Sequence, residues 1–484
     1  MIKSKLIDYF NTNAASAYKW HKRNRYYYDE LTSFLRFNIE PDANVLEIGS
    51  GTGDILNAVR PKKGVGLDLS PAVVEFAKKK YPKLYFMEGD IDRGIYLNET
   101  FNYIILSDLI GYLEDIQTSF ENLRKVCNER SRLLVTHYNN LWHPILKASE
   151  FFRLKQKQPI MNWLSGKDIA HLLDLAGFEI IKKERYLLFP KYIPLLSWFL
   201  NKVIANLPAM NYFCLVDFLV LRLKPTNFSV NDNFSVSVII PARNERGNIE
   251  EVVKRIPPLG KKTEIIFVEG NSNDGTLDEI KRVADIYKKE KDIKFFVQDG
   301  TGKYDAVKKG FANASGDILM ILDTDLSVPP ESLRKFYEII SSGRAEYIHG
   351  TRLIYPMEND AMQFLNYLAN RFFGLAFSWL LGQHITDTLC GTKVFFRKDY
   401  EKIAANRKFF GDFDPFGDFD LIFGVSKLNL KLVELPIHYK ERKYGLTNIS
   451  RFITTPPVNR LCYPVITTPK VDVKRTAKRR LVGG

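Results

Sequence analysis

Two aspartates separated by one residue, Asp323 and Asp325, follow an apolar run that begins at residue 317 and is typical of a buried strand. Neighbouring strand residues point to opposite faces, but at a strand end the chain turns and both side chains can reach one ligand. Carboxylates are preferred ligands of hard divalent cations, which can bridge and neutralise a diphosphate. The pair therefore predicts a Mg²⁺ or Mn²⁺ site held by Asp323 and Asp325. By itself, the spacing also suits two solvated acids.

A glycine-rich loop is expected far upstream, in the run VLEIGSGTGD at residues 45–54. Gly49, Gly51 and Gly53 would let the backbone turn tightly and approach a ligand, and a helix that follows would point its amide groups at it. A dinucleotide fingerprint needs glycine or alanine at position 54, where this chain has Asp54, so a hydride-transfer cofactor is disfavoured. Asp68 ends the next apolar run, where an acid can accept hydrogen bonds from ribose hydroxyls.

The elements that must position these residues alternate between apolar runs and amphipathic stretches. Strands are indicated at 44–49, 64–69, 84–90, 101–108 and 132–139, and helices at 71–81 and 116–127. This alternation predicts a parallel sheet covered on both faces, to which the runs 178–189 and 214–223 could add a late hairpin. A second series of strands is indicated at 236–242, 263–270, 293–299, 317–323 and 346–353, so a second α/β domain is expected.

The glycine loop, Asp68, and Asp90 at the end of the third run together resemble the class I S-adenosylmethionine-dependent methyltransferases over about residues 27–224. The resemblance implies that the loop and Asp68 hold the amino-acid and ribose parts of the cofactor, with Asp90 near the adenine. It implies also that residues 107–115 line the methyl-donor pocket. The cofactor-binding residues expected on this basis are Glu47, Gly49, Gly51, Gly53, Asp68 and Asp90.

A catalytic base is not expected in this half, because methyl transfer from a sulfonium needs mainly alignment and a desolvated nucleophile. His137 and Tyr138 would lie near the pocket, with a structural role favoured for both. The stretch 18–31 interleaves basic and aromatic residues, but no nucleic-acid-binding module accompanies it. We interpret it as a helix that closes over the cofactor site, and we expect no nucleic-acid partner.

In the second series, the segments 241–245, 267–276, 300–311 and 323–325 occur in an order that resembles family 2 glycosyltransferases of the GT-A fold, in particular the polyprenyl-phosphate hexosyltransferase branch. The resemblance implies inverting, metal-dependent transfer of a sugar from a nucleotide-sugar to a lipid phosphate or related glycan acceptor. The donor-binding residues expected on this basis are Pro241, Ala242, Asn244, Glu245, Glu269, Lys303 and Asp323.

The acceptor side of the same resemblance includes segments 387–397 and 411–424 and the phosphate loop 439–450. It implies that Asp418 and Asp420 orient or deprotonate an incoming hydroxyl and that Arg442 contacts phosphate; these three are the predicted catalytic residues. The chain departs from the family pattern at three places. Glu269-Gly270 replaces an acid pair that meets the donor base, Ser327 replaces a glutamine in the metal loop, and Asn448 replaces the last lysine of the phosphate loop.

The length of 484 residues favours two to four domains, and the composition is that of an ordinary globular protein. The apolar fraction is 45%, and 70 lysines and arginines against 56 acids give a net charge of +14, which indicates acidic partners. The four cysteines lack metal-ligand spacing. The expected class is α/β, with two doubly wound domains, a Rossmann-like methyltransferase followed by a GT-A glycosyltransferase. The expected boundaries are 1–224 for the first domain, 225–235 for a linker, 236–452 for the second domain and 453–484 for a basic, flexible tail.

Two apolar stretches, 192–207 and 372–382, are shorter or more interrupted than a membrane span. Core helices are favoured for both, and contact with a bilayer surface is the alternative. No signal-peptide pattern is visible, so a cytoplasmic location is expected, with possible peripheral contact at the membrane face. A second hypothesis for the whole chain is a glycosyltransferase that acts on a soluble or cell-envelope glycan and whose N-terminal domain binds cofactor without catalysis.

Overall fold

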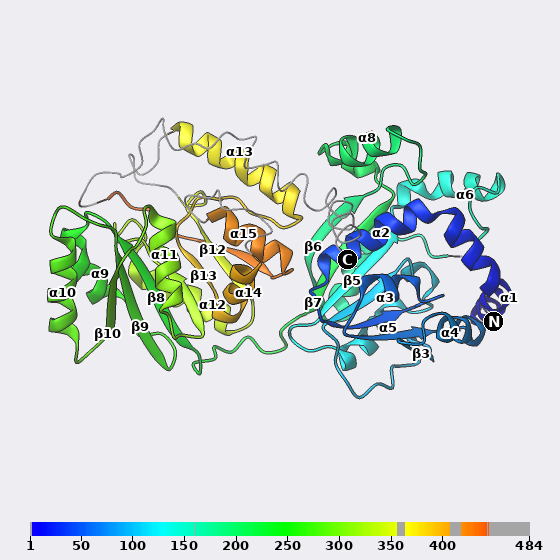
Figure 1. Ribbon diagram of the computed structural model, residues 1–484, viewed down its shortest axis with the longest axis horizontal. Coiled ribbons are helices and arrows are strands. Elements are labelled where there is room, and N and C mark those ends of the chain that lie inside the picture. Colours follow the sequence, from blue (N-terminus) through cyan, green and yellow to red (C-terminus); the bar gives the residue numbers. More distant parts are fainter. Residues whose placement is uncertain (1, 160, 356–363, 407–417, 443, 445–484) are drawn as a thin grey trace, which may run out of the picture. The chain divides into compact units, whose positions relative to one another are not determined.

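The computed structural model describes residues 2–159, 161–355, 364–406, 418–442 and 444 (Figure 1). The chain divides into two compact units, the first ending at Lys224 and the second beginning at Pro225. Each unit contains its own seven-stranded sheet and its own hydrophobic core.

The sheet of the first unit has the order β3-β2-β1-β4-β5-β7-β6. The strands β1 to β5 run parallel to their neighbours, whereas β7 is antiparallel to both β5 and β6. The runs predicted as strands all form strands, and the predicted late hairpin is present as the β6–β7 pair. The bounds are β1 Asn44–Ile48, β2 Lys63–Asp68, β3 Tyr85–Glu88, β4 Tyr103–Ser107, β5 Arg132–Tyr138, β6 Phe178–Tyr186 and β7 Val216–Leu223.

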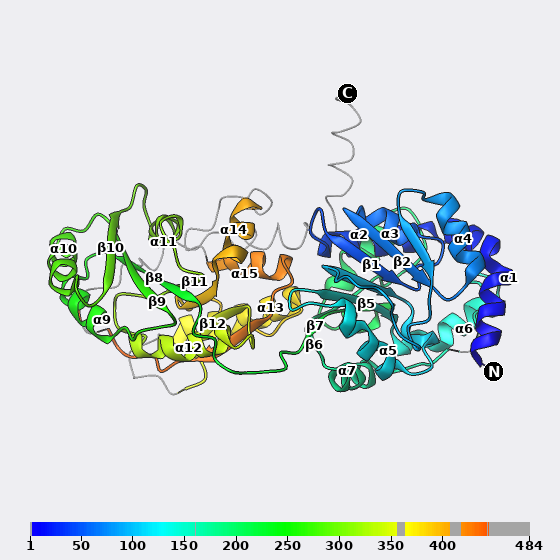
Figure 2. The same cartoon turned by 90° about the horizontal axis from the view of Figure 1, so that it is seen from below.

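Helices cover both faces of this sheet (Figure 2). Alternate residues of β1 show why: Val45 packs into the cluster with α2, α3 and α4, while Leu46 and Ile48 pack into the cluster with α5 and α7. A strand buried on both faces needs mostly apolar side chains, and in β1 Val45, Leu46 and Ile48 supply them, with Glu47 as the single buried acid. The helices are α1 Ile2–Arg23, α2 Arg25–Asn38, α3 Asp54–Val59, α4 Pro71–Lys80, α5 Ile116–Leu123, α6 His143–Phe151, α7 Gly166–Leu175 and α8 Leu196–Lys202.

The sheet of the second unit has the order β10-β9-β8-β11-β13-β12-β14. The strands β10, β9, β8 and β11 are parallel, β13 is antiparallel to both its neighbours, and β12 is parallel to β14. Analysis of the sequence identified five of these strands but not β13 and β14. The bounds are β8 Ser235–Ala242, β9 Lys262–Glu269, β10 Asp292–Val297, β11 Ile318–Ile321, β12 Tyr347–Thr351, β13 Lys393–Phe396 and β14 Leu432–Pro436.

Helices also cover both faces of this second sheet. Side chains from α9, α10 and α12 join the main core, and α11 packs on the other face, where Gly310 lies against Ile239. Both units are therefore α/β, as the sequence predicts, but the second sheet is mixed, because the unpredicted strand β13 runs antiparallel to its neighbours. The helices are α9 Ile249–Arg255, α10 Thr276–Tyr287, α11 Lys303–Ala312, α12 Leu333–Ser341, α13 Phe364–Leu381, α14 Arg397–Ala405 and α15 Asp418–Lys427.

The expectation that both apolar stretches form core helices is wrong for 192–207 and only partly right for 372–382. In the first, α8 and the turn before it leave most large apolar side chains exposed. In the second, α13 buries Phe377 and Leu381 but exposes Phe372 and Leu375. Apolar composition predicts burial only when a neighbouring element covers the helix face. Among the described residues, no helix combines the length and apolar character needed to span a bilayer.

Candidate active sites

The candidate donor site lies where the parallel strands β8, β9 and β11 end. The loops that follow these strands are interlocked by hydrogen bonds. The Asn244 amide N–H donates to Ser272 Oγ at 2.9 Å, and the Asn273 N–H donates to Asn244 Oδ1 at 3.0 Å. Thr324, between the two predicted metal ligands, donates to the Pro241 carbonyl at 2.7 Å. The sheet therefore gathers segments about 80 residues apart at one edge, where ligands bind in open α/β sheets.

Arg442 joins two of the predicted site acids. Its guanidinium donates to Asp325 Oδ2 at 3.0 Å and to Glu245 Oε1 at 2.8 Å. Burial raises the pKa of Glu245 to about 7, although the Arg442 charge opposes the shift. The structure therefore brings the predicted phosphate-loop arginine to the predicted donor and metal residues.

Asp323 is paired with Lys303, whose Nζ lies 2.5 Å from Asp323 Oδ1. Burial alone would raise the pKa of this carboxyl, but the positive charges of Lys303, Lys393 and Arg352 together hold the pKa below its usual range. Gly391 borders both side chains so closely that a Cβ atom there would collide with the Asp323 carboxylate and the Lys303 ammonium. The segment that carries Gly391 therefore forms a wall of the same site.

The carboxylates of Asp323 and Asp325 fit a cation that a diphosphate helps to hold. Asp325 Oδ1 accepts hydrogen bonds from the Ser327 hydroxyl at 2.6 Å and the Ser327 N–H at 3.1 Å, which fixes the carboxylate. Among the described residues, no three His, Cys, Asp or Glu side chains gather closely enough to hold a metal ion. Mg²⁺ commonly takes one or two carboxylates and completes its shell with water and substrate phosphates, so two acids suffice.

The Glu269 carboxylate shapes its own loop. It accepts hydrogen bonds from the Ser272 N–H at 2.6 Å and the Asn271 N–H at 3.1 Å, and Glu269 is 3% exposed. These bonds hold the loop that meets Asn244. Glu269, which stands where the family has the first acid of its pair, thus stabilises a loop at the edge of the candidate donor site.

Of the two predicted acceptor acids, Asp420 lies in α15 and is buried. The Tyr304 hydroxyl donates to Asp420 Oδ2 at 2.8 Å, and Tyr304 directly follows Lys303 in the chain. This bond links α15 to the residues that hold Asp323. Asp418 begins α15, but its side chain lies outside the described residues, as do Asn448 and the tail 453–484.

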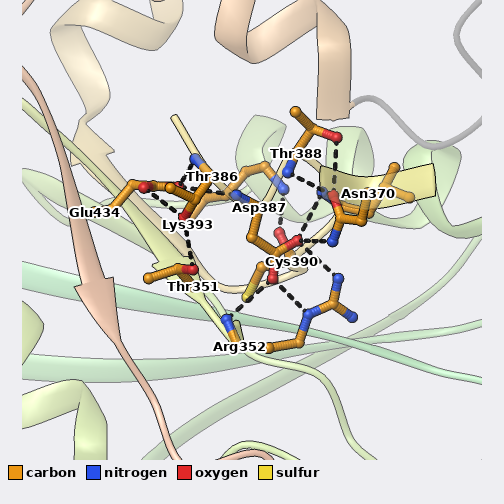
Figure 3. Close-up of polar contacts among 10 residues, drawn as sticks. Thr351, Arg352, Asn370, Thr386, Asp387, Thr388, Cys390, Lys393 and Glu434 are labelled. Carbon is orange, nitrogen blue, oxygen red and sulfur yellow. Dashed lines mark hydrogen bonds and ion pairs between the residues drawn. The ribbon is translucent and has the colours of Figure 1, made fainter. Parts of the chain in front are cut away.

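A buried ion pair anchors the segment that carries Gly391 (Figure 3). Arg352, just past β12, donates to the two Asp387 carboxylate oxygens at 2.7 and 2.8 Å, and Asn370 of α13 donates to Asp387 Oδ1 at 2.7 Å. Asp387 is fully buried; burial alone would raise the pKa of this carboxyl, but Arg352 holds it well below the usual range. Analysis of the sequence identified the segment 387–397 but missed Arg352 and Asn370.

In the first unit, the glycine loop is closed by the predicted ribose acid. The Gly51 N–H donates to Asp68 Oδ2 at 2.8 Å, and the Ser70 N–H donates to Asp68 Oδ1 at 3.0 Å. Gly53 has a φ of +76°, and a Cβ atom there would collide with the Phe86 ring, so only glycine fits. The loop therefore has the tight turn and bare backbone that a ligand approach requires.

The other predicted cofactor residues have different surroundings. Glu47 is 1% exposed and accepts a hydrogen bond from the Leu56 N–H at 3.1 Å, and burial raises the pKa of this carboxyl well above its usual value.

Asp90 pairs with Lys3 of α1 at 2.6 Å. The same helix places Asn11 2.6 Å from the Ser70 hydroxyl. Thus α1 lies over the ends of β2 and β3. The segment that covers this edge of the sheet therefore begins at residue 2, earlier than the stretch 18–31 that was predicted to close over the cofactor site.

A small pocket beside this site is lined by Asp108, His137, Tyr138 and Trp163. The Tyr27 hydroxyl donates to Asp108 Oδ2 at 2.6 Å, and burial raises the pKa of Asp108. Asp108 has a φ of +53°, a conformation that L-residues rarely adopt and that often occurs at functional sites. The resemblance implied a role for the segment 107–115 but did not single out Asp108, which no local pattern marks.

Comparison with known proteins places a transferase domain in each unit. Residues 20–183 match a methyltransferase domain, and residues 237–404 match glycosyl transferase family 2. The chain therefore joins a methyltransferase domain to a family 2 glycosyltransferase domain, which confirms the prediction from the sequence.

Individual relatives match only in part. The dolichol-phosphate mannosyltransferase of Saccharomyces cerevisiae is 38% identical over 108 residues, covering 21% of this chain and 39% of that protein. The undecaprenyl-phosphate 4-deoxy-4-formamido-L-arabinose transferase of Pectobacterium atrosepticum is 32% identical over 118 residues, covering 24% and 36%. The chain thus spans little more than a third of the length of these relatives. A putative methyltransferase solved with the Trm112 methyltransferase activator of Haloferax volcanii is 17% identical. The match covers 45% of this chain and 97% of that chain, with a TM-score of 0.35.

Proposed function

We propose that the chain is a bifunctional enzyme whose second unit transfers a sugar from a nucleotide-sugar to a polyprenyl phosphate or related acceptor, in an inverting, metal-dependent reaction. The observation that carries this proposal is the cluster formed by Asp323, Asp325, Lys303, Arg442 and Glu245 at the carboxyl edge of the second sheet. The cluster offers two acids for a cation and two cations for phosphate within one site.

Asp323 and Asp325 would hold the divalent cation, which when bound supplies positive charge to the leaving diphosphate. Lys303 and Arg442 balance these acids before substrate binds. When a diphosphate enters, Arg442 can exchange its bond to Glu245 for one to phosphate, because a carboxyl with a pKa of about 7 is readily protonated. Gly391 leaves room for ligand at the other end of the cluster, since a side chain there would fill the space beside Asp323 and Lys303.

The acceptor would enter beside Asp420, which Tyr304 fixes. An acceptor phosphate is already ionised and needs no base, whereas a hydroxyl acceptor could give its proton to a nearby carboxylate. The exposed apolar residues of α13, Phe372 and Leu375, favour a lipid acceptor over a soluble glycan. The related proteins named as dolichol- and undecaprenyl-phosphate transferases support the same class of acceptor.

The first unit is proposed to transfer a methyl group from S-adenosylmethionine. The amides of the glycine loop would bind the amino-acid part, Asp68 the ribose hydroxyls, and the Asp90 region the adenine. The methyl acceptor would enter the pocket lined by Asp108, Tyr138 and Trp163. In that pocket Tyr27 holds the Asp108 carboxylate in place, so alignment of the acceptor is the main contribution of this chain.

Thermal shift of the full chain against a panel of nucleotide-sugars, with and without Mn²⁺, tests the donor proposal. We expect at least one nucleotide-sugar to stabilise the protein only when Mn²⁺ is present. Equal shifts with and without the metal would contradict metal dependence. Calorimetric titration with S-adenosylmethionine tests the first unit independently, and no heat of binding at millimolar cofactor would contradict its proposed role.

A further inference from the structure

The first unit has an unusual concentration of exposed apolar side chains on α6, on α8 and on the turns beside them. Six of these residues are 57–84% exposed, and we call them the apolar face: Phe151, Phe152, Tyr192, Leu195, Trp198 and Tyr212. Isolated exposed apolar residues are common, but a contiguous group of this size marks an interaction surface. The apolar face is remote in sequence from the glycine loop, and the transfer chemistry proposed above makes no use of it.

Hydrogen bonds show that the segments of the apolar face are neighbours. Trp142, just before α6, donates from Nε1 to the Phe213 carbonyl at 2.8 Å, and Asn139 donates to the Tyr212 carbonyl at 2.9 Å. Lys191 lies 3.5 Å from the Leu154 carbonyl, which links the turn before α8 to the end of α6. Figure 1 shows α6 and α8 on the same side of the unit. The segments that carry the apolar face therefore lie next to one another on one side of the unit.

The turn that carries Leu195 is firmly built. The Leu196 N–H donates to the Pro194 carbonyl at 2.7 Å, and Leu195 between them has φ +61° and ψ −47°, a rare and strained three-residue turn. The buried Ser197 hydroxyl accepts from the Ile193 N–H and donates to the Lys191 carbonyl, both at 2.7 Å. The turn is thus held from the inside while its tip, Leu195, is 84% exposed. A strained turn that displays leucine to water is expected where a partner covers the leucine.

The charge around the apolar face identifies the partner. Residues 141–158 and 187–213 contain six lysines and arginines and a single acid, Glu150; Lys202 is neutralised by Glu30 of α2 at 2.7 Å and Lys155 pairs with Glu150 at 3.6 Å, which leaves four basic residues in excess. Lys147, Arg153 and Lys157 are exposed beside the aromatic residues. Tyrosine and tryptophan with lysine and arginine around an apolar surface are typical of segments that lie in the headgroup region of a membrane. A second copy of the chain would bring the same positive charges face to face and be repelled.

We infer that the apolar face docks on a bilayer surface that contains anionic phospholipid. Phe151 and Leu195 would enter the boundary between headgroups and acyl chains, and the surrounding basic residues would contact lipid phosphates. This docking is independent of either transferase activity. It would keep the first unit at the membrane without a membrane-spanning segment.

Flotation of the full chain with vesicles tests this inference, with no substrate present. We expect the protein to float with phosphatidylcholine vesicles that contain about a third phosphatidylglycerol, and flotation to fall with increasing salt. The variant Phe151→Glu/Leu195→Glu should bind these vesicles at least about tenfold more weakly. The control is Tyr96→Glu, because Tyr96 is 89% exposed in the loop between β3 and β4, far along the sheet order from β6 and β7. Equal flotation of the double variant and the wild type would overturn the inference.

A second measurement does not rely on loss of binding. A polarity-sensitive fluorophore attached at Leu195→Cys, with Cys462→Ser to avoid a second label, should shift to shorter wavelength when anionic vesicles are added. The remaining cysteines Cys127, Cys214 and Cys390 are buried. The same label at Tyr96→Cys should not shift. The absence of a shift at position 195 would show that lipid is not the partner. The same conclusion would follow if light scattering found a dimer that the Phe151→Glu/Leu195→Glu variant abolishes while vesicle binding is unchanged.

Discussion

Arg442 donates a hydrogen bond of 3.0 Å to Asp325, across 117 residues of chain, and in doing so connects the predicted phosphate loop to the predicted metal pair. The same guanidinium reaches Glu245, so one cation balances two acids in the absence of ligand. When substrate binds, the diphosphate can take the place of the acids beside Arg442, and its divalent cation can take the place of the guanidinium beside Asp325. Each internal ion pair is then replaced by an ion pair with the ligand.

The Glu245 carboxyl should make the stability of the second unit depend on pH. Its pKa is about 7 in the folded chain, above the ordinary value of 4.5, because burial disfavours the ionised form. Its contribution to stability is therefore fully present below pH 4.5 and is lost as the pH rises to 7. Relative to Glu245→Gln, the wild type should lose melting temperature between pH 5 and pH 8. A difference between the two proteins that stays constant over this range would contradict the shifted pKa.

Asp387→Asn should destabilise the second unit by about 3–5 kcal/mol, because it leaves the Arg352 guanidinium without its buried partner. Urea unfolding of the full chain, followed by tyrosine and tryptophan fluorescence, measures the effect on that unit's transition. Asp285→Asn is the matched control: its partner Lys288 is exposed, so the change should be about 0–1 kcal/mol. Similar effects of the two substitutions would show that the buried pair does not anchor the segment with Gly391.

Parts of this fold could be predicted from the sequence because strands such as β4, β5, β8 and β11 are rich in apolar residues over four or more positions. The strand β13 could not, since its first residue is the buried Lys393, whose charge is accommodated by the Cys390 carbonyl at 2.6 Å. The strand β14 pairs with β12, 85 residues away, and its apolar residues are interrupted by Lys431 and Glu434, so it lacks the continuous apolar run by which other strands were identified. The exposure of Leu195 could not be predicted either, because the sequence shows that a residue is apolar but not whether another element covers it.

The residues of the candidate sites also fall into two groups, those that the sequence identifies and those that only the structure reveals. Motif order located Asp323, Asp325, Glu245 and Arg442, which the structure brings together. The partners of Asp387 were missed because Arg352 lies 35 residues away, outside any motif. Asp108 was missed because its role depends on tertiary burial and on Tyr27, 81 residues upstream.

Asp68→Ala should weaken the binding of S-adenosylmethionine by about 1.5–3 kcal/mol, because charged hydrogen bonds to ribose would be lost. The substitution also removes the acceptor of the Gly51 N–H, so the loop loses part of its support. Isothermal titration calorimetry measures the change. Glu75→Ala, an exposed acid on α4, is the control and should bind the cofactor as the wild type does. Unchanged affinity of the Asp68 variant would place the cofactor elsewhere.

Gly391→Ala should reduce sugar transfer strongly while leaving the first unit unaffected, because the added Cβ meets the Asp323 carboxylate and the Lys303 ammonium. Turnover of the preferred nucleotide-sugar gives the effect, and S-adenosylmethionine binding serves as the internal control for folding of the chain. Gly343→Ala has only Pro225 atoms near the added Cβ but strains a backbone with φ +74°, so it sets an upper limit for the effect of a glycine substitution outside the site on the second unit. If both variants retain full turnover, the wall formed by Gly391 does not border the reacting groups.

The most direct test of the central claim is the manganese dependence of nucleotide-sugar hydrolysis in Asp323→Asn and Asp325→Asn, compared with Asp299→Asn, whose side chain is exposed beside Lys309. We predict that either site substitution abolishes the metal-dependent reaction, that Asp299→Asn keeps it, and that all three proteins still bind S-adenosylmethionine. Metal-dependent turnover that is unchanged in both site variants would contradict a cation held by this pair of aspartates.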